Sequence, residues 1–493
     1  MNNLVVLPLL IPLLTAVILI FLSKRVKVQR WISLISVFLN MLSVVLLINQ
    51  VQDKGIQTLY MGGWLPPYGI VFVADMFALL LVMTTLVVAA GCLLYAFRTI
   101  GEQREKYYFY PFVQFILAGV IGSFITGDLF NLFVCFEVML ISSYALIVLG
   151  GTKRQLRETI KYVLINIISS SLFVAAMAYL YGVVGTLNMA HLSVRVAEAG
   201  QGGILSVIAV MLLIVFALKA GLFLFFWLPG SYSVPPTAIT ALFGALLTKV
   251  GLYAIIRTFT LIFYHDQSFT HSIIAWMAIA TMILGGLGAV AYKDVYRILN
   301  YNVVISVGFI AFGLAVATKE SLDGTVLYLM HDMVAKALMF ILGGMIIAAA
   351  GTNRLNEMGG LIKRYPWMGW MFFILTLALV GIPPLSGFPG KVLMVRGGLN
   401  EGEFLLTAFA VASSLIVLYS LVRLFMGAFW REDHLLPVRD QKKWHSTAYV
   451  SVIGLFILVI ALGVGSEWIY SYAGQAGEVL ANPSIYIDAV LKE

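Results

Sequence analysis

Ionisable side chains lie inside long apolar stretches at six places where they could handle protons. Lysine stands at four of them, glutamate at one and histidine at one: Glu137, Lys219, Lys249, His331, Lys336 and Lys391. A lysine in an apolar surrounding has a lowered proton affinity, so it can change between its charged and neutral forms. A nearby glutamate raises that affinity, and histidine exchanges protons near neutral pH. These residues therefore predict a proton path.

Placing charges inside a membrane is costly, which supports a functional role for these residues. Each charge at mid-membrane costs about 2.5–3.5 kcal/mol, so five together cost on the order of 12–18 kcal/mol. Pairing, neutral states or a water-lined path must offset this cost. Glu137 with Lys219 could instead form a static ion pair that only fastens helices together, and His331 alone could have a structural role.

The composition predicts which elements position these residues. The chain has 493 residues, of which 61% are hydrophobic and 11% charged, and its mean hydropathy is +0.99. A soluble domain has about a quarter charged residues, so this chain belongs in a lipid bilayer. The net charge of +8 could suggest nucleic acid, but the basic residues lie in short loops between apolar runs. We therefore expect no nucleic-acid partner.

Apolar segments long enough to cross a membrane occur about fourteen times. They cover residues 4–22, 31–49, 74–97, 109–126, 129–149, 160–181, 204–228, 237–263, 272–292, 298–317, 324–350, 367–395, 403–429 and 446–466. Backbone exposed to lipid must satisfy its own hydrogen bonds, which favours helices. The expected fold class is an all-α polytopic membrane protein with about 14 transmembrane helices. The first span lacks a preceding cationic segment and a cleavage site, so we expect it to be retained.

The basic residues indicate the orientation of the spans. About 20 of them lie in the odd-numbered loops, including Arg439, Lys442 and Lys443, whereas the even-numbered loops and the tails hold five, including Lys492. Loops rich in lysine and arginine stay in the cytoplasm. The odd-numbered loops are therefore predicted to be cytoplasmic and both termini to lie outside.

The chain resembles itself at a shift of 166 residues. Asp128 aligns with Asp294 and Thr152 with Thr318, and matches continue over about 58 residues. Five spans separate equivalent positions, and an odd number inverts the second unit in the membrane. We expect two inverted five-helix repeats, one of helices 4–8 and one of helices 9–13. The expected divisions are 1–108 (helices 1–3), 109–263 (first repeat), 272–429 (second repeat) and 446–493 (helix 14 and an outward C-terminal tail).

Prolines and glycines interrupt two of the spans. The seventh continues from Lys219 into WLPG, and the twelfth contains GIPPLSGFPGK, which ends at Lys391. Residues of these types break the helical hydrogen-bond ladder and free carbonyls and helix ends. Any single proline could be a packing kink, but two breaks in corresponding spans predict discontinuous helices 7 and 12, counted as membrane spans.

Position along the spans brings most of the charges to one depth. Glu137, Lys219, Lys249 and Lys336 each lie about 12–18 Å from a membrane surface at 1.5 Å per residue. The hydrocarbon core is about 30 Å thick, so these residues form a belt near its midplane. Arg257 and Arg423 lie closer to helix ends and are expected to extend toward the surface or contact a neighbouring subunit.

The sequence contains no phosphate-binding glycine loop, no dinucleotide fingerprint and no Cys or His cluster. We therefore expect no cofactor and no metal. The predicted role is that of a secondary ion transporter subunit and not that of an enzyme.

Several motifs resemble the antiporter-like family that respiratory complex I, membrane-bound hydrogenases and Mrp-type cation/proton antiporters share. The resemblance covers roughly residues 70–430. It rests on FEVMLISSYAL, WLPGSYSVPPTAITALFGALLTKVG, KDVYRILNYNVVISVGF, HDMVAKALMF and GIPPLSGFPGK. It implies that Glu137 pairs with Lys219 and that Lys249 is a connecting residue. It also implies that Lys391 is the terminal residue, while His331 and Lys336 serve the second half.

Two features favour the Mrp branch of this family. Lys391 stands where some complex I relatives carry glutamate, and the chain ends soon after its last span. The resemblance then implies a proton-translocating subunit of a Na+/H+ antiporter in the bacterial plasma membrane. Its partners would be other subunits of the Mrp hetero-oligomer, protons and Na+. The alternatives are a proton-pumping subunit of a complex I-like NADH:quinone oxidoreductase or membrane-bound hydrogenase, and a scaffold whose ion pairs only fasten helices.

Overall fold

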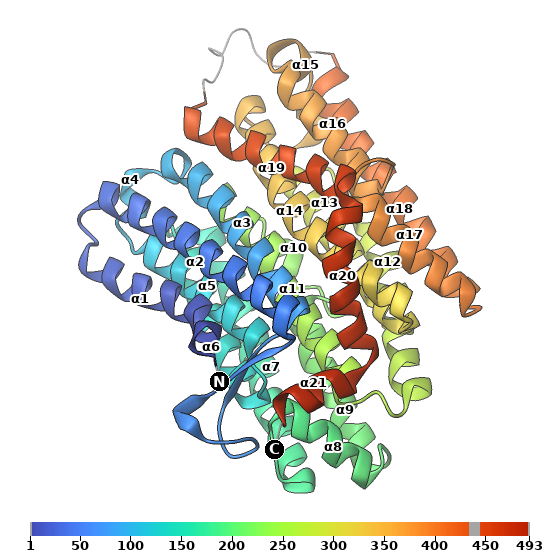
Figure 1. The fold of residues 1–493 in the computed structure, drawn as a ribbon. Helices are drawn as coiled ribbons and strands as arrows, with labels where there is room; N and C mark the ends of the chain where they lie inside the picture. Colours follow the sequence, from blue (N-terminus) through green and yellow to red (C-terminus); the bar gives the residue numbers. More distant parts are fainter. Residues whose placement is uncertain (1, 433–443, 492–493) are drawn as a thin grey trace.

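The computed structural model describes residues 2–432 and 444–491, and these residues are mainly helical (Figure 1). Arg439, Lys442, Lys443 and Lys492, which contributed to the predicted orientation, lie outside the described residues. Within the described part, eleven helices are long and apolar enough to cross a membrane, and three more apolar helices are shorter. Each of the fourteen predicted spans corresponds to one of these helices, which confirms the all-α polytopic fold class.

The N-terminal part places two membrane-facing helices beside one buried helix. The helices are α1 (Leu7–Phe21), α2 (Val26–Lys54) and α3 (Met76–Thr99), and the turn η1 (Asn3–Val6) precedes α1. Apolar residues of α1 and α2 are exposed, as expected of a lipid-facing surface, whereas α3 is almost wholly buried. A hairpin that the sequence analysis missed joins α2 to α3; it consists of β1 (Gln57–Tyr60), η2 (Met61–Gly63) and β2 (Val71–Ala74).

The next segment contains the first broken span. Its elements are α4 (Glu102–Glu105), α5 (Phe109–Ile125), α6 (Leu129–Val148), α7 (Lys153–Val184), α8 (Met189–Ala199), α9 (Ile204–Ala220), α10 (Leu228–Ser231) and α11 (Thr237–Leu261). The seventh span is interrupted between α9 and α10, where Gly221 has a positive φ of 73° that suits a residue without a side chain. The short helix α8 is not among the elements predicted from the sequence.

The second broken span follows a similar order of elements. These are α12 (Gln267–Ala291), α13 (Val295–Val316), α14 (Lys319–Ala350), η3 (Leu355–Glu357), α15 (Leu361–Arg364), α16 (Pro366–Val380), α17 (Gly387–Asn400), α18 (Phe404–Phe425) and the π-helical turn η4 (Met426–Trp430). The break between α16 and α17 confirms that the twelfth span is discontinuous.

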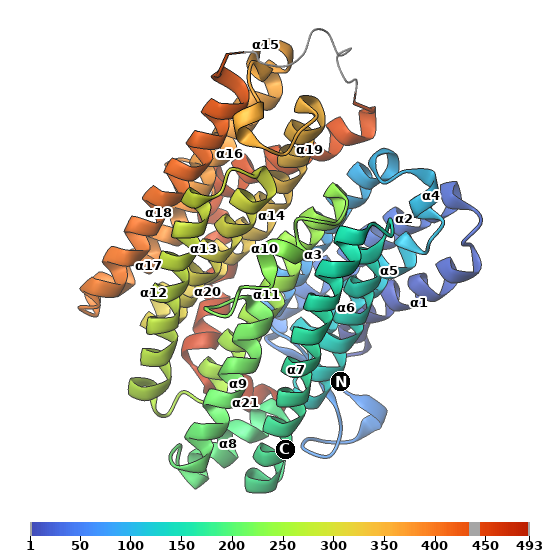
Figure 2. The ribbon, with the colours of Figure 1, turned by 180° about the vertical axis from the view of Figure 1, so that it is seen from behind.

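The central helices α11 and α14 lie against each other, with green and yellow ribbons adjacent in Figure 2. Glycines permit this approach: a side-chain carbon at Gly244 would meet Phe340, and one at Gly344 would meet Thr237. Every residue of α11 after Thr237 is buried. Lys249 on α11 and Asp332 and Lys336 on α14 are therefore removed from both lipid and bulk water.

Backbone contacts recur at a spacing of 166 residues. Asp128 forms an isolated bridge with Asn188, and Asp294 forms one with Arg354. The helices α7 and α14 start 166 residues apart and each has 32 residues. Both are capped by a threonine and end at a glycine in the left-handed conformation: Thr152, Thr318, Gly185 and Gly351. These equivalences are what an internal repeat predicts, while the bounds of the two units and their inversion stay a prediction.

The C-terminal part is folded against the core. It comprises α19 (Ser446–Val464), α20 (Ser466–Ala481) and α21 (Pro483–Val490). The segment after α19, expected as a tail, thus forms two further helices. Small residues such as Ala473, Ala476 and Gly477 let α20 pack closely on α14 and α3, and the Tyr470 hydroxyl donates to Asp323 Oδ2 at 3.1 Å.

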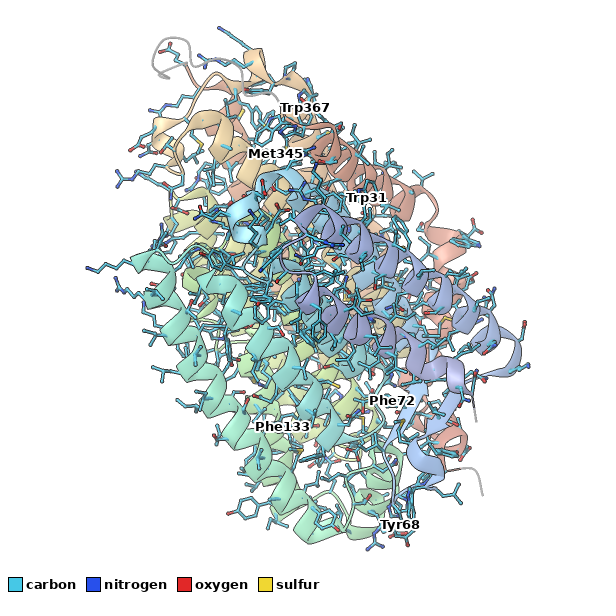
Figure 3. All side chains as sticks on the ribbon, turned by 90° about the vertical axis from the view of Figure 1, so that its left-hand side faces the viewer. Trp31, Tyr68, Phe72, Phe133, Met345 and Trp367 are labelled. Carbon is cyan, nitrogen blue, oxygen red and sulfur yellow. The ribbon has the colours of Figure 1, made fainter. Side chains whose placement is uncertain are left out.

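Aromatic side chains lie toward both ends of the helical body. Trp31 and Trp367, each close to a basic loop, are found toward one end, and Tyr68 lies at the other (Figure 3). Tryptophan and tyrosine favour the two interfaces between membrane and water. Their placement fits a body that spans a bilayer along this direction.

Candidate functional site

Glu137 and Lys219 meet through a serine. The Ser170 hydroxyl on α7 donates to Glu137 Oε1 at 2.5 Å, and Lys219 Nζ donates to Ser170 Oγ at 3.3 Å. Glu137 comes from α6 and Lys219 from the last turn of α9. The resemblance implies a direct pair, whereas in this conformation the hydroxyl connects the two charges.

Local structure holds Lys219 in place. Its side chain is only 4% exposed, and its ammonium group lies 5.1 Å from the centre of the Phe136 ring. The lysine stands two residues before the glycine that ends α9, where the helix dipole favours a positive charge. Beyond the break, Trp227 Nε1 donates to the Leu218 carbonyl at 2.9 Å and satisfies one of the freed acceptors.

A second cluster joins α11 to α14. Lys249 Nζ lies 2.7 Å from Asp332 Oδ2, and Lys336 Nζ lies 3.7 Å from Asp332 Oδ1. All three side chains are 0% exposed. Lys249 also donates to the Gly244 carbonyl, and Lys336 to the Asn302 carbonyl, both at 2.9 Å. One carboxylate thus lies between two lysines.

Asp332 is not among the residues predicted from the sequence, where Glu137 is the acidic counterpart of the lysines. Its signal was present, because Asp332 and Lys336 are four residues apart and therefore share a helix face. Lys249, which also contacts the carboxylate, is 83 residues away in the chain. Helical spacing alone could not show that contact.

A third group surrounds the break in the twelfth span. His331 Nδ1 is 2.7 Å from the Ser386 hydroxyl in the break, and His331 Nε2 has no hydrogen-bond partner among the described residues. Lys391 Nζ donates to the carbonyls of Leu379 and Val380 at 3.1 and 3.0 Å and to Ser414 Oγ at 2.8 Å. The lysine therefore caps carbonyls at the C-terminus of α16 that have no partner within the helix.

The six predicted residues thus fall into neighbouring clusters. His331 directly precedes Asp332 on α14, and the Tyr328 ring lies between His331 and Lys391, with its centre 5.5 Å from the His331 ring centre and 5.5 Å from Lys391 Nζ. His331 and Lys336 still have different neighbours, as their five-residue spacing predicts. Between the first and second groups, α9 and α11 are in backbone contact, because a side-chain carbon at Gly251 would lie 2.5 Å from the Ala220 nitrogen.

Two arginines outside these clusters contact groups of their own chain. Arg257 is 2% exposed and its guanidinium lies 2.6 Å from Asp75 Oδ2, so the expectation that it reaches the surface is wrong. The Asp75 carboxylate also caps α3 by accepting from Ala78 N at 3.0 Å. Arg423 donates to the carbonyls of Val290 and Tyr292 at the end of α12, and it therefore contacts its own chain.

The fold and the buried clusters define a multi-pass helical membrane protein with ionisable groups in its interior. Residues 126–417 match the family described as NADH:quinone oxidoreductase/Mrp antiporter, TM, and the chain belongs to this family.

Known relatives match the whole chain. It is 53% identical to a Na(+)/H(+) antiporter subunit of Bacillus subtilis (strain 168), with both chains covered completely. The Mrp complex from Dietzia sp. DQ12-45-1b has a chain with a TM-score of 0.92 at 28% identity, with 100% of each chain covered. A chain of the archaeal membrane-bound sulfane sulfur reductase has a TM-score of 0.91 at 28% identity, covering 99% of this chain and 100% of the other. The similarities to the Bacillus antiporter subunit and to the Dietzia Mrp chain together confirm the expected resemblance to the Mrp branch.

Proposed function

We propose that the chain is the proton-translocating subunit of a multisubunit Na+/H+ antiporter complex. The full-length relative with 53% identity carries the name of an antiporter subunit, and the Dietzia chain of similar fold belongs to an Mrp complex. The partners in this proposal are other antiporter subunits, protons and Na+. The complex lies in the bacterial plasma membrane, and the positive-inside rule favours both termini outside.

The proposed path runs along Glu137, Lys219, Lys249, His331, Lys336 and Lys391. Its strongest support is the cluster of Asp332 with Lys249 and Lys336. When both lysines are protonated, the cluster carries an excess positive charge that burial makes costly. Loss of one proton makes the cluster neutral overall. The cluster can therefore accept and release a proton at a moderate cost in free energy, as a proton relay requires.

The first cluster gives a means of changing proton affinity. A serine hydroxyl both donates and accepts, so Ser170 connects the charges of Glu137 and Lys219 without direct contact. If the lysine moves to contact the glutamate directly, the carboxylate favours its protonated form more strongly. If the lysine moves away, it releases its proton. Alternation between these positions would drive the next step of the path.

The proposal is tested with everted membrane vesicles that contain the native complex. A preformed proton gradient should collapse on addition of Na+ and persist on addition of choline chloride. A proton gradient that persists after addition of Na+, in vesicles that contain the assembled complex, would contradict antiport.

A second candidate is an energy-transducing subunit of a redox complex. The TM-score of 0.91 with a chain of a respiratory membrane complex favours this alternative. Purification of the native complex distinguishes the two. Co-purifying flavin, iron–sulfur or nickel subunits would support the redox role, and their absence together with Na+-dependent proton movement would support antiport.

A further inference from the structure

We propose that a basic cavity beside the break after α9 binds the phosphate headgroup of an anionic phospholipid. The cavity has a volume of about 660 Å³, which is large enough for a headgroup. Among the described residues, five cationic side chains and one carboxylate, Glu158, line it. The cations are Lys153, Arg154, Arg157, Lys161 and Arg297. The lining therefore has an excess of four positive charges.

Among the described residues, three of the five cations form no ion pair. Glu158 Oε1 lies 3.1 Å from Lys161 Nζ and 3.9 Å from Arg157 Nε, so this carboxylate pairs with two of the cations. No ion pair forms at Lys153 or Arg154 within the described part of the chain. Arg297 lies over the Tyr292 ring at 4.7 Å, which leaves its guanidinium free to contact a phosphate. The described lining thus has one carboxylate for five cations, although Arg154 and Arg297 also line a neighbouring cavity with Asp294 and Glu357.

The apolar surface next to the cavity indicates a lipid as the source of that anion. Helix α7 exposes Leu156, Ile160 and Leu164, whose four-residue spacing forms one stripe leading away from the basic end. The Phe226 ring, which lines the cavity, is 68% exposed. In a bound anionic lipid, basic side chains usually hold the phosphate and the acyl chains lie along an apolar stripe. A free phosphate ion has no acyl chains that would contact this apolar stripe.

The cavity adjoins the segment that follows Lys219. Pro229 and Gly230 of α10 line it, and a side-chain carbon at Gly230 would meet Glu158 Oε2. The Asn300 side chain donates to the Pro229 carbonyl at 3.3 Å. A lipid in this cavity would therefore contact the continuation of the broken span beyond the proton path.

Native mass spectrometry of the purified complex tests this site. The complex is titrated with phosphatidylglycerol, phosphatidylcholine and inorganic phosphate. The site variant is Lys153→Gln/Arg154→Gln/Arg297→Gln. The control variant is Lys24→Gln/Arg25→Gln/Lys27→Gln, which removes the same charge from the loop between α1 and α2 and from the first turn of α2. We expect the site variant to bind phosphatidylglycerol about tenfold more weakly than the wild type or the control, with phosphatidylcholine unaffected.

Three results would overturn the proposal. Equal phosphatidylglycerol binding by the site and control variants would place the lipid elsewhere. Full displacement by inorganic phosphate at equal concentration would indicate a free-anion site. Crosslinking of Arg154 to a partner subunit in the native complex, with no lipid retained, would show that protein covers the cavity. If the triple variant fails to assemble, the single exposed-residue variants Lys153→Gln and Arg154→Gln are compared in the same titration.

Discussion

Asp332 Oδ2 lies 2.7 Å from Lys249 Nζ, and this contact connects the buried helices α14 and α11 at the centre of the protein. The same carboxylate faces Lys336 at 3.7 Å. The second half of the proposed path therefore has its own acidic residue, as Glu137 is the acidic residue of the first half.

Replacing this carboxylate should block the second half of the path. In Asp332→Asn the two lysines lose their counter-charge while the side-chain size is retained, so both favour the neutral form. We expect at least about a tenfold loss of Na+-driven proton movement in everted vesicles, since hydrogen bonds to charged groups contribute about 1.5–3 kcal/mol. Asp53→Asn, which removes an exposed carboxylate of α2, is the control. Wild-type antiport in assembled Asp332→Asn complex would exclude the residue from the path.

The serine between Glu137 and Lys219 allows a closely matched comparison. Ser170→Ala removes the hydroxyl that connects the charges and should reduce antiport about fivefold or more, whereas Ser170→Thr should keep most of it. Ser169→Ala is the control, because that hydroxyl donates to the Val215 carbonyl instead. Equal activity of the two alanine variants would show that Ser170 does not connect the charges functionally.

Lys391 should have both a structural and a functional role. Lys391→Met leaves the carbonyls of Leu379 and Val380 without their donor at the end of α16. We expect loss of antiport and a lower melting temperature of the purified complex. Ser414→Ala removes only one acceptor of the lysine and should have a smaller effect on both. A melting temperature unchanged by Lys391→Met would argue against the capping role.

The pair of Arg257 and Asp75 should stabilise the fold without carrying protons. Removing one partner of a buried ion pair costs about 3–5 kcal/mol, because the other charge stays buried alone. Arg257→Met and Asp75→Asn should each lower thermal stability, and the double variant should recover part of the loss and retain antiport. An assembled double variant without antiport would instead place Arg257 in the path.

Hydropathy and charge predicted the spans well because a membrane restricts backbone to helices and tolerates few charges. The same reasoning found Lys219 and Lys391, since lysines next to proline- and glycine-rich breaks stand out in an apolar chain. It missed α8, α20 and the β1–β2 hairpin, because no long apolar run marks them.

Contacts between distant residues account for the remaining differences. Arg257 seemed close to a helix end, but its partner Asp75 is 182 residues away and lies at the start of a buried helix. Ser170 and Ser386 could not be selected from sequence, because serine is common within and between apolar helices and each of them contacts its ionisable partner only after folding.

Antiport by the double variant Glu137→Gln/Lys219→Gln tests proton movement through the buried charges most directly. The measurement is the Na+-driven collapse of a proton gradient in everted vesicles, with complex assembly checked on native gels. We expect the complex to assemble and the collapse to be absent, because neither residue can then hold or release a proton. Collapse at the wild-type rate would show that the two charges only fasten helices together, and it would contradict the proposed path.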